Sequence, residues 1–308
     1  MHLTVAICTW NRCDMLRQTL EQLTQLRVPA GIEWELLVVN NNSADATDRV
    51  IDSFKERLPI QGLFEGKAGK SNALNLASNT AKGQYIIWTD DDVLVDPDWM
   101  IAYHRAFVRW PDAVVFGGAI EPWFEGTPPE WLRTLLPKVG NAYGVRNLGA
   151  EPMPLQPPEI MPFGANMAVR RDEQLRFLYD TSVGPRPNSN LRGEEIQLVA
   201  RMLESGLTGW WVPDAKILHF IPAERQTVRH IRSYYSGWGE YVSLLDDKDH
   251  GEKLWFGRPR WAWRGLVEGE LRYRVKRVLR RPEAWIDDLV AASIAHGQLR
   301  AYARRPLR

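Results

Sequence analysis

Short apolar runs alternate with amphipathic stretches over about the first 120 residues of the chain. The apolar runs predict strands at Thr4–Thr9, Glu33–Val39, Ile60–Phe64, Tyr85–Thr89 and Ala113–Gly117. The stretches between them predict helices at Asp14–Leu26, Asp45–Arg57, Ser71–Ala81 and Asp98–Trp110. Such repeated strand–helix units indicate the α/β class, with a Rossmann-type, mostly parallel sheet that is flanked by helices.

The pattern changes beyond this region. Proline and aromatic residues crowd Glu121–Pro162, which predicts a long irregular excursion because proline interrupts regular elements. A strand, a helix, two short strands and a helical C-terminal part are then predicted at Pro162–Arg170, Glu194–Ser205, Thr208–Val212, Ala215–Phe220 and beyond Thr227. A break in this helical part is expected around Gly251–Trp263. We therefore expect a sheet domain over residues 1–225 and a helical extension over residues 226–308.

The 308-residue chain has a formal net charge of +1, but its charges are unevenly distributed. Residues 251–308 contain 14 Lys and Arg against 6 Asp and Glu, a balance of +8, so the first 250 residues carry −7. The acidic body argues against nucleic acid as a partner. The basic tail mixes arginine with tryptophan, which suits an anionic membrane surface and equally suits a helical cap with a solvated basic face.

Several features of the sequence bear on the cellular compartment of the protein. No apolar run approaches the ~18 residues needed to cross a bilayer, and the N-terminus lacks the layout of a signal peptide. Two cysteines, Cys8 and Cys13, are too few for a disulfide framework. We expect a cytoplasmic protein, either free or peripheral at the inner face of the cell membrane.

Three consecutive carboxylates, Asp90, Asp91 and Asp92, follow directly on the predicted strand Tyr85–Thr89. In an open α/β sheet this end of a strand is where ligands bind. Carboxylates packed this closely repel one another, so we expect a compensating positive charge. A hard divalent cation that also holds substrate phosphates would provide it. The alternative for these three residues alone is a solvated acidic turn.

Two polar loops follow the first two predicted strands. Thr9–Arg12 and Asn40–Ser43 offer backbone N–H groups and short polar side chains that suit a nucleotide or a phosphate, although each alone is also an ordinary turn. Lys67 and Lys70 are cations beside a predicted helix start. Phe64 occupies the position where a P-loop needs glycine, so these lysines do not belong to a P-loop.

Further candidates lie about 100 residues beyond the acidic triplet. Glu194 and Glu195 open a predicted helix, where one carboxylate can face a cleft while the other braces. Acidic residues in a first helical turn also interact favourably with the helix dipole, which is their structural alternative. His219 ends a predicted strand and is either a metal ligand or an ordinary core or surface histidine.

In content and order these segments resemble the inverting family 2 glycosyltransferases of GT-A fold. The similar segments lie between Leu3 and Phe220 and are VAICTWNR, ELLVVNNNSADAT, KAGKSNALNLA, IIWTDDDVLVDPDWM, GANMAVRR and GEEIQLVARMLESGLTGWWVPDAKILH. The resemblance implies an enzyme that moves a sugar from a nucleotide-diphosphate sugar to an acceptor hydroxyl, with Mn²⁺ or Mg²⁺ as cofactor. The implied acceptor is a glycan or a lipid-linked molecule in surface glycan or glycolipid synthesis.

The resemblance also implies roles for individual residues. The expected general base is Glu195, with Glu194 beside it, and the expected metal ligands are Asp90, Asp92 and His219. The residues expected to bind the nucleotide sugar are Thr9, Asn11, Arg12, Asn40, Asn42, Lys67, Lys70, Asn72, Asp90, Asp91 and Gly164.

Two positions depart from the family pattern. Asn40 stands where family members commonly have an aspartate that accepts from the nucleotide base, and an amide can both donate and accept, so the base preference stays open. Glu194 and Glu195 stand where a Glu-Asp pair commonly supplies the base, so the second side chain is one methylene longer here.

Two other functions fit parts of the sequence. A non-catalytic carbohydrate- or nucleotide-binding module on the same fold would need no base, whereas this chain has base candidates. An enzyme that transfers phosphate from a nucleoside triphosphate is disfavoured by the failed P-loop spacing.

Overall fold

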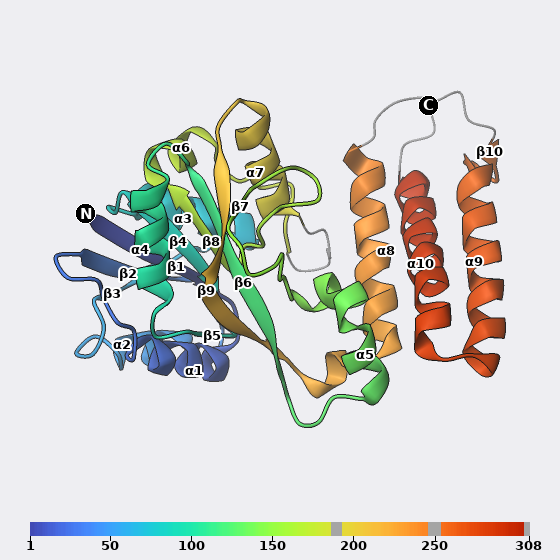
Figure 1. The fold of residues 1–308 in the computed structure, drawn as a ribbon, viewed down its shortest axis with the longest axis horizontal. Helices are drawn as coiled ribbons and strands as arrows, with labels where there is room; N and C mark the ends of the chain where they lie inside the picture. The colour runs from blue at the N-terminus through green and yellow to red at the C-terminus, as the bar shows by residue number, and fades with distance from the viewer. Residues whose placement is uncertain (186–192, 246–253, 305–308) are drawn as a thin grey trace. The chain divides into compact units, whose positions relative to one another are not determined.

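The chain forms two compact units in the computed structural model, which describes residues 1–185, 193–245 and 254–304. The sheet unit contains residues 1–123, 144–185 and 193–220, and the helical unit contains residues 124–143, 221–245 and 254–304. Figure 1 shows the strands gathered in the sheet unit and long helices, in orange and red, in the helical unit. The domain boundary at residue 225 stays a prediction.

A mixed sheet of nine strands, counted over the described residues, forms the centre of the sheet unit. Its strands are β1 His2–Thr9, β2 Glu33–Asn40, β3 Ile60–Phe64, β4 Tyr85–Asp90, β5 Val93–Val95, β6 Val115–Phe124, β7 Met153–Pro154, β8 Asn166–Arg170 and β9 Gly209–Ile221. Their order is β3-β2-β1-β4-β8-β6-β9-β5, with β7 also paired to β9. The four strands from β3 to β4 run parallel, and β8 joins β4 and β6 antiparallel.

Helices cover both faces of this sheet, which confirms the predicted α/β class (Figure 1). The helices are α1 Cys13–Leu23, α2 Thr47–Asp52, α3 Lys70–Thr80, α4 Trp99–Arg109, α6 Arg171–Arg176 and α7 Glu194–Glu204. Successive side chains of a strand point to opposite faces. On β1, Leu3, Val5 and Ile7 therefore pack into one core with α1, α2 and α4, while Ala6 packs into a second core with α3 and α7. Strands buried on both sides explain the continuous apolar runs of the sequence.

The prediction of an irregular excursion over Glu121–Pro162 is wrong. β6 continues to Phe124, and helix α5 (Glu130–Val139) follows it. Leu132, Leu135 and Val139 are buried at helical spacing on α5. Pro129 immediately precedes the helix, where no intrahelical bond is lost. Pro137 lies inside the last turn and removes one main-chain N–H, and the helix ends two residues later.

The two short strands predicted at Thr208–Val212 and Ala215–Phe220 are one continuous strand, β9. Pro213 lies inside it without ending it. On this strand, β7 pairs with Trp210 and Trp211, and β5 pairs with the stretch Ile217–His219. Pro213 falls between these two pairings, so its missing N–H removes no bond to β7 or β5.

The helical unit is built mainly from three long helices. These are α8 Val228–Leu245, α9 Arg260–Leu279 and α10 Pro282–Arg304, and α10 packs against both of the others. α8 and α10 approach closely at Gly239 and Gly297, where a Cβ atom would collide with the main chain of the opposite helix. A small hairpin of β10 (Leu254–Trp255) and β11 (Arg258–Pro259) precedes α9, within the break that the sequence predicts. None of the described helices combines the length and the apolar character needed to span a membrane.

Asn166 at the start of β8 joins several elements of the sheet unit and is fully buried. Its Nδ2 donates to the main-chain oxygens of Ala119 and Ala215, at 2.9 and 2.7 Å. Its Oδ1 accepts from Trp99 Nε1 and from the Tyr103 hydroxyl, both at 2.8 Å. One amide thus satisfies four buried polar groups from β6, β9 and α4.

We expect Asn166→Ala to lower the free energy of unfolding by about 3 kcal/mol, because it leaves buried donors and acceptors without partners. Urea unfolding followed by circular dichroism measures this loss. The matched control is Asn79→Ala, an exposed asparagine on α3 whose amide bonds only to the Asn75 carbonyl one turn away. The control should change stability by less than about 1 kcal/mol, and an equal loss in both variants would contradict the role of Asn166.

Candidate active site

The sheet register brings the polar strand ends to one edge. β1 ends at Thr9 and its parallel neighbour β4 ends at Asp90. On the other side of β1, Thr9 is aligned with Asn40, the last residue of β2. Asp91 and Asp92 form the turn between β4 and β5. The loops that the sequence singles out therefore lie next to one another.

Arg12 binds two carboxylates of the acidic triplet. Its Nη1 donates to Asp91 Oδ1 at 3.1 Å and to Asp92 Oδ2 at 2.8 Å, and Thr9 Oγ1 donates to Asp91 Oδ2 at 2.7 Å. Both oxygens of the buried Asp91 are thus engaged within the protein. Burial and the adjacent Asp92 charge raise the pKa of Asp91 to about 6, although Arg12 and Thr9 act in the opposite direction. Asp91 is therefore a brace that orients Arg12.

Lys70, the first residue of α3, compensates the third carboxylate. Its Nζ lies 2.8 Å from Asp90 Oδ1. Burial alone would raise the pKa of Asp90, but Lys70, with smaller contributions from His219 and Arg12, outweighs burial and the pKa is lowered. Asp90 is accordingly an anion. Its partner Lys70 and the Arg12 guanidinium approach the end of β4 from opposite sides.

Asp90, Asp92 and His219 offer ligand atoms that all lie within 4.8 Å of one another. The antiparallel pairing of Val93 with His219 brings the imidazole beside the triplet, with His219 Nε2 3.5 Å from Asp92 Oδ1. Asp92 Oδ1 is buried and has no hydrogen-bond partner among the described residues. Two carboxylates and an imidazole are ligands that suit Mn²⁺ or Mg²⁺. These residues therefore fit a divalent cation.

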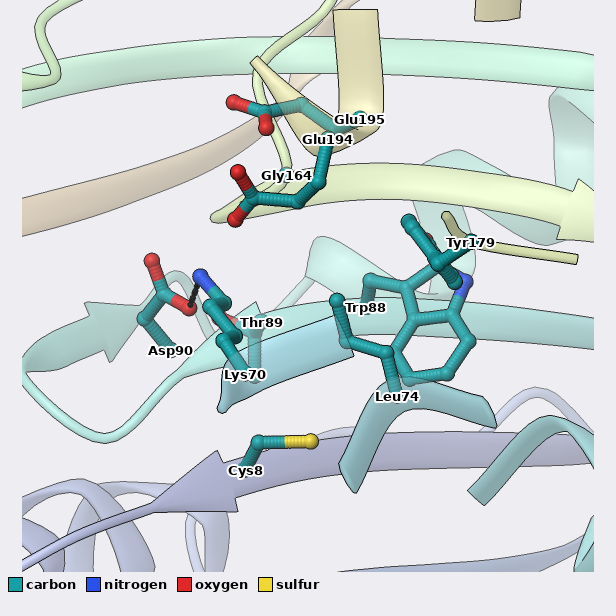
Figure 2. Close-up of a pocket in the computed structure, with 10 residues that line it drawn as sticks. All are labelled: Cys8, Lys70, Leu74, Trp88, Thr89, Asp90, Gly164, Tyr179, Glu194 and Glu195. Carbon is teal, nitrogen blue, oxygen red and sulfur yellow. Dashed lines mark hydrogen bonds and ion pairs between the residues drawn. The ribbon is translucent and has the colours of Figure 1, made fainter. Parts of the chain in front are cut away.

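A small pocket opens beside these residues (Figure 2). Its lining comes from β1, α3, β4, α7 and the connecting segments, and consists of Cys8, Lys70, Leu74, Trp88, Thr89, Asp90, Gly164, Tyr179, Glu194 and Glu195. Figure 2 shows the Glu194 and Glu195 carboxylates extending to the side of the pocket on which the Lys70–Asp90 pair lies. Sequence-predicted base candidates and the end of β4 are thus brought together.

The two glutamates at the start of α7 differ in burial. Glu195 is half-buried and faces Gly164, where an added Cβ would lie 3.5 Å from its Cβ and Cγ atoms. Glu194 is buried, with Oε2 accepting from the Gly193 backbone N–H at 3.1 Å. Burial and the charge of Glu195 raise the pKa of Glu194 to about 7, against the opposing effect of Lys70.

The asparagines after β1 and β2 take different positions. Asn11 and Asn42 are exposed and have left-handed backbone, with φ of 52° and 62°. Asn40 is buried, with Nδ2 donating to Asp48 Oδ1 at 2.7 Å and Oδ1 accepting from the Ser43 N–H at 2.8 Å. Both polar ends of Asn40 are therefore used to shape its own loop.

Asn41 organises the lysine loop, although no pattern in the sequence distinguishes it from its two asparagine neighbours. Its Nδ2 donates to the carbonyls of Glu65 and Lys67, and its Oδ1 accepts from the Gly69 N–H at 3.0 Å. Lys67 itself is exposed. Asn72 on α3 donates to the Ala68 carbonyl at 3.1 Å and so closes the same loop from the helix side.

Two other contributors were missed from the sequence. Thr19 of α1 lies with Oγ1 2.9 Å from the main-chain oxygens of both Asp91 and Val93, which fixes the turn of the triplet. Tyr179 lines the pocket and stacks edge-on against Trp88. A threonine inside an amphipathic helix and a tyrosine in a loop carry no pattern that reveals such contacts.

A sequence model described as Glycosyl transferase family 2 matches residues 4–173. This chain belongs to glycosyl transferase family 2. The predicted family and the prediction of a glycosyltransferase enzyme are thereby confirmed. The match covers β1 to α6, and hence the triplet, the asparagine loops and Gly164 of this family 2 transferase.

Two relatives of the family 2 transferase align over most of both chains. The succinoglycan biosynthesis protein ExoM of Rhizobium meliloti is 23% identical over 258 residues, covering 82% of this chain and 77% of its own length. The glucosyl-dolichyl phosphate glucuronosyltransferase of Haloferax volcanii is 24% identical over 272 residues, covering 81% of each chain.

Solved structures share the fold. The mannosyltransferase PcManGT from Pyrobaculum calidifontis, solved in complex with GDP-Man and Mn²⁺, gives a TM-score of 0.57 at 17% identity and covers 99% of this chain and 76% of its own. TarS 1–349 of S. aureus gives a TM-score of 0.51 at 13% identity, covering 97% of this chain and 91% of its own. The predicted GT-A-like fold is confirmed.

The raised pKa of Glu194 predicts a pH-dependent stability. An acid whose pKa rises from 4.5 unfolded to about 7 folded costs the fold stability progressively between these pH values and fully above them. We expect Glu194→Gln to be more stable than the parent at pH 8, by up to about 3 kcal/mol, because it removes that buried charge. The gain should shrink as the pH falls towards 4.5 and vanish below it, where the parent glutamate is neutral in both states.

Thermal and urea unfolding of both proteins at several pH values between 5 and 8 measures this difference. Asp91 titrates in the parent and in the variant alike, so its effect cancels. The control is Glu56→Gln, an exposed glutamate of the sheet unit that should show no such pH-dependent gain. A Glu194→Gln variant that is less stable than the parent at the alkaline end would show that the charged form is favoured instead.

Proposed function

We propose that this family 2 transferase moves a sugar from a nucleotide-diphosphate sugar to an acceptor hydroxyl, with inversion and with a divalent cation. The observation that carries the proposal is the shared pocket, in which Glu194 and Glu195 line the same space as Lys70 and Asp90 (Figure 2). A base candidate and the charges that suit a diphosphate thus flank one small volume. A single displacement at a sugar carbon needs this arrangement.

Glu195 is the proposed general base, because it is half-buried and lines the pocket beside Gly164. Its carboxylate removes the proton of the acceptor hydroxyl, and the hydroxyl oxygen forms the new bond to the anomeric carbon. The bond from that carbon to the diphosphate oxygen breaks, and its electron pair leaves with the nucleoside diphosphate. Attack from the face opposite to the leaving group inverts the anomeric configuration.

The diphosphate is assigned to the end of β4. Asp90, Asp92 and His219 would hold Mn²⁺ or Mg²⁺, and the bound ion would neutralise charge on the departing diphosphate. Lys70, 2.8 Å from Asp90, supplies a second positive charge at the same place. The Mn²⁺ in the PcManGT complex supports a cation of this kind.

The nucleotide is assigned to the loops after β1 and β2. Asn11 and Asn42 are the exposed amides of these loops, whereas Asn40 contributes through the loop that it shapes with Asp48 and Ser43. PcManGT was solved with GDP-Man, and TarS 1–349 was also solved with UDP, so neighbours of this fold use different bases. The remaining proposed contacts to the donor are Thr9, Arg12, Lys67, Asn72 and Gly164. Asp91, which the sequence also assigns to the donor site, would act through the Arg12 side chain that it orients.

The acceptor is proposed to be a glycan or a lipid-linked sugar. ExoM is named for succinoglycan biosynthesis, and the Haloferax volcanii relative is named for a glucosyl-dolichyl phosphate. Both names support synthesis of polysaccharide or glycolipid. Residues 1–225 as the transferase domain and a cytoplasmic location stay predictions of the sequence.

We expect Glu195→Gln to lower kcat by about a thousandfold, because an amide cannot accept the hydroxyl proton, while the donor dissociation constant changes little. Transfer is measured with the donor identified by nucleotide binding, and donor affinity by calorimetry. Glu56→Gln serves as the matched control, because it removes an exposed carboxylate away from the pocket and should retain full activity. Unchanged transfer by Glu195→Gln would refute the base assignment. A chain that binds a donor but never transfers it would favour the non-catalytic module.

A nucleotide panel tests the metal site. We expect one of UDP, GDP, dTDP or CDP to raise the melting temperature only when Mn²⁺ is present, since the diphosphate binds through the cation. At ~100 times the dissociation constant the gain should be about 2.7 kcal/mol. CMP should give a smaller shift, because it lacks the second phosphate.

Asp92→Asn should abolish this metal-dependent shift, because it removes the carboxylate charge. Arg12 donates to Oδ2, so it would hold the remaining amide oxygen on its own side and leave the NH2 group facing the cation. Asp112→Asn, at an exposed position of the sheet unit, is the control and should keep the shift. A shift that is identical with EDTA, or that survives in Asp92→Asn, would show that these carboxylates do not hold the cation.

A further inference from the structure

The outer face of α9 carries an apolar stripe that the fold of the helical unit does not use. The stripe consists of Val267, Leu271, Val275 and Val278, each more than half exposed. Their spacing of four, four and three residues places them on one side of the helix. The opposite side, with Ala262, Gly269 and Tyr273, is the buried one. α9 therefore has one apolar face towards α10 and a second towards solvent.

The hairpin before α9 lies at the N-terminal end of the same helix (Figure 1). It exposes further apolar side chains. Leu254, Trp255 and Phe256 are 57%, 60% and 83% exposed. Trp263 of α9 donates its indole N–H to the Trp255 carbonyl at 3.0 Å, which ties the hairpin to the helix. We call Leu254, Trp255 and Phe256 the hairpin tip.

The conformation of Phe256 is unusual for its residue type. It forms the two-residue turn with Gly257, and both have positive φ, of 51° and 71°, as a type I′ turn requires. Asparagine followed by glycine is the preferred sequence for this turn, and a bulky residue there is strained. Phe256 is 83% exposed, and within the hairpin its ring contacts that of Trp255, 5.7 Å away between centroids. A strained residue with so exposed a ring points to a contact outside the unit.

Positive charge surrounds these apolar side chains. Residues 254–281 contain nine Lys and Arg against two Glu, a balance of +7. Both glutamates are already paired, Glu268 with Arg264 and Arg272, and Glu270 with Arg232 and Arg274. Asp288 of α10 compensates part of this charge by pairing with Arg272 and Lys276. The remaining excess suits a partner that is anionic as well as apolar.

We propose that the α9 stripe and the hairpin tip dock this chain on an anionic lipid bilayer. α9, with 20 residues, is about 30 Å long and would lie along the surface. Its valines and leucine would enter the boundary between headgroups and acyl chains, with the flanking arginines at the phosphates. The rings of Trp255 and Phe256 would anchor the N-terminal end of α9 at the same depth.

A second copy of this chain is the competing occupant, and the charge opposes it. Two identical faces, each with an excess of positive charge, would meet in a symmetric contact, and like charges placed opposite one another repel. A bilayer with anionic headgroups satisfies both the apolar stripe and its basic margin. Docking needs neither a sugar donor nor a metal, so it stands independently of the proposed transfer reaction.

Sedimentation with unilamellar vesicles tests the proposal on the full chain. We expect binding to phosphatidylcholine vesicles that contain about 30% phosphatidylglycerol, weak binding to phosphatidylcholine alone, and release by about 0.5 M NaCl through screening. The double variant V275Q/V278Q should weaken binding by at least about tenfold. R280Q/R281Q, at the C-terminal end of α9, should weaken it by about fivefold for each removed charge and reduce its dependence on salt.

The Phe256→Asn variant distinguishes an effect on membrane contact from an effect on folding. It replaces the ring by the residue that the turn prefers, so the melting temperature should stay equal or rise while vesicle binding falls by about tenfold. Val108→Gln is the control, because it makes the same substitution as V275Q at a valine of α4 that is also more than half exposed. It should bind vesicles like the parent chain.

Three results would overturn the proposal. The first is no sedimentation with either vesicle type. The second is binding that Phe256→Asn and V275Q/V278Q leave unchanged although circular dichroism shows folded protein. The third is a dimer in light scattering that V275Q/V278Q converts to monomer without any vesicle binding by the parent, which would assign the face to self-association.

Discussion

The compensation of three adjacent carboxylates at the end of β4 is the constraint on which the site depends. Asp91 and Asp92 are buried, and without Arg12 two anions would face each other in a poorly solvated turn. Arg12 comes from the loop after β1, and Lys70 comes from the start of α3. The contacts that neutralise the triplet therefore also fix the loop and the helix that form the two sides of the site. The same set of contacts therefore compensates the charge and assembles the site.

Sequence pattern predicts the parallel half of the sheet well, because strands buried on both faces leave continuous apolar runs that few other structures allow. Its main failure concerns proline, which was treated as a breaker in the excursion. Helix α5 nevertheless contains Pro137, and β9 continues through Pro213. Whether a missing N–H matters depends on the partner that it would have bonded, and partners are set by tertiary structure rather than by local composition.

The sequence predicts which loops form the site, but it predicts less well what each side chain in those loops does. Strand ends are visible in the sequence, so the triplet, the asparagine run and His219 could be placed at one edge. Which of three consecutive asparagines faces solvent could not, because loop side chains follow no fixed period; Asn40 and Asn41 turn inward to build loops, and Asn42 is exposed. Thr19 acts on main-chain oxygens, a role that any helical threonine could have and that only the fold selects.

Two residues have the opposite burial to the one that their chemistry favours, and each lies at a proposed functional site. Glu194 is a carboxylate that burial disfavours, placed beside a second carboxylate at a pocket. Phe256 is a large apolar ring left in solvent on a strained turn that asparagine would occupy more easily. Neither choice stabilises its unit, and a sequence selected for folding alone would replace both. In the sheet unit the locally unfavourable residue thus lies at the proposed catalytic pocket. In the helical unit it lies at the proposed membrane-docking surface.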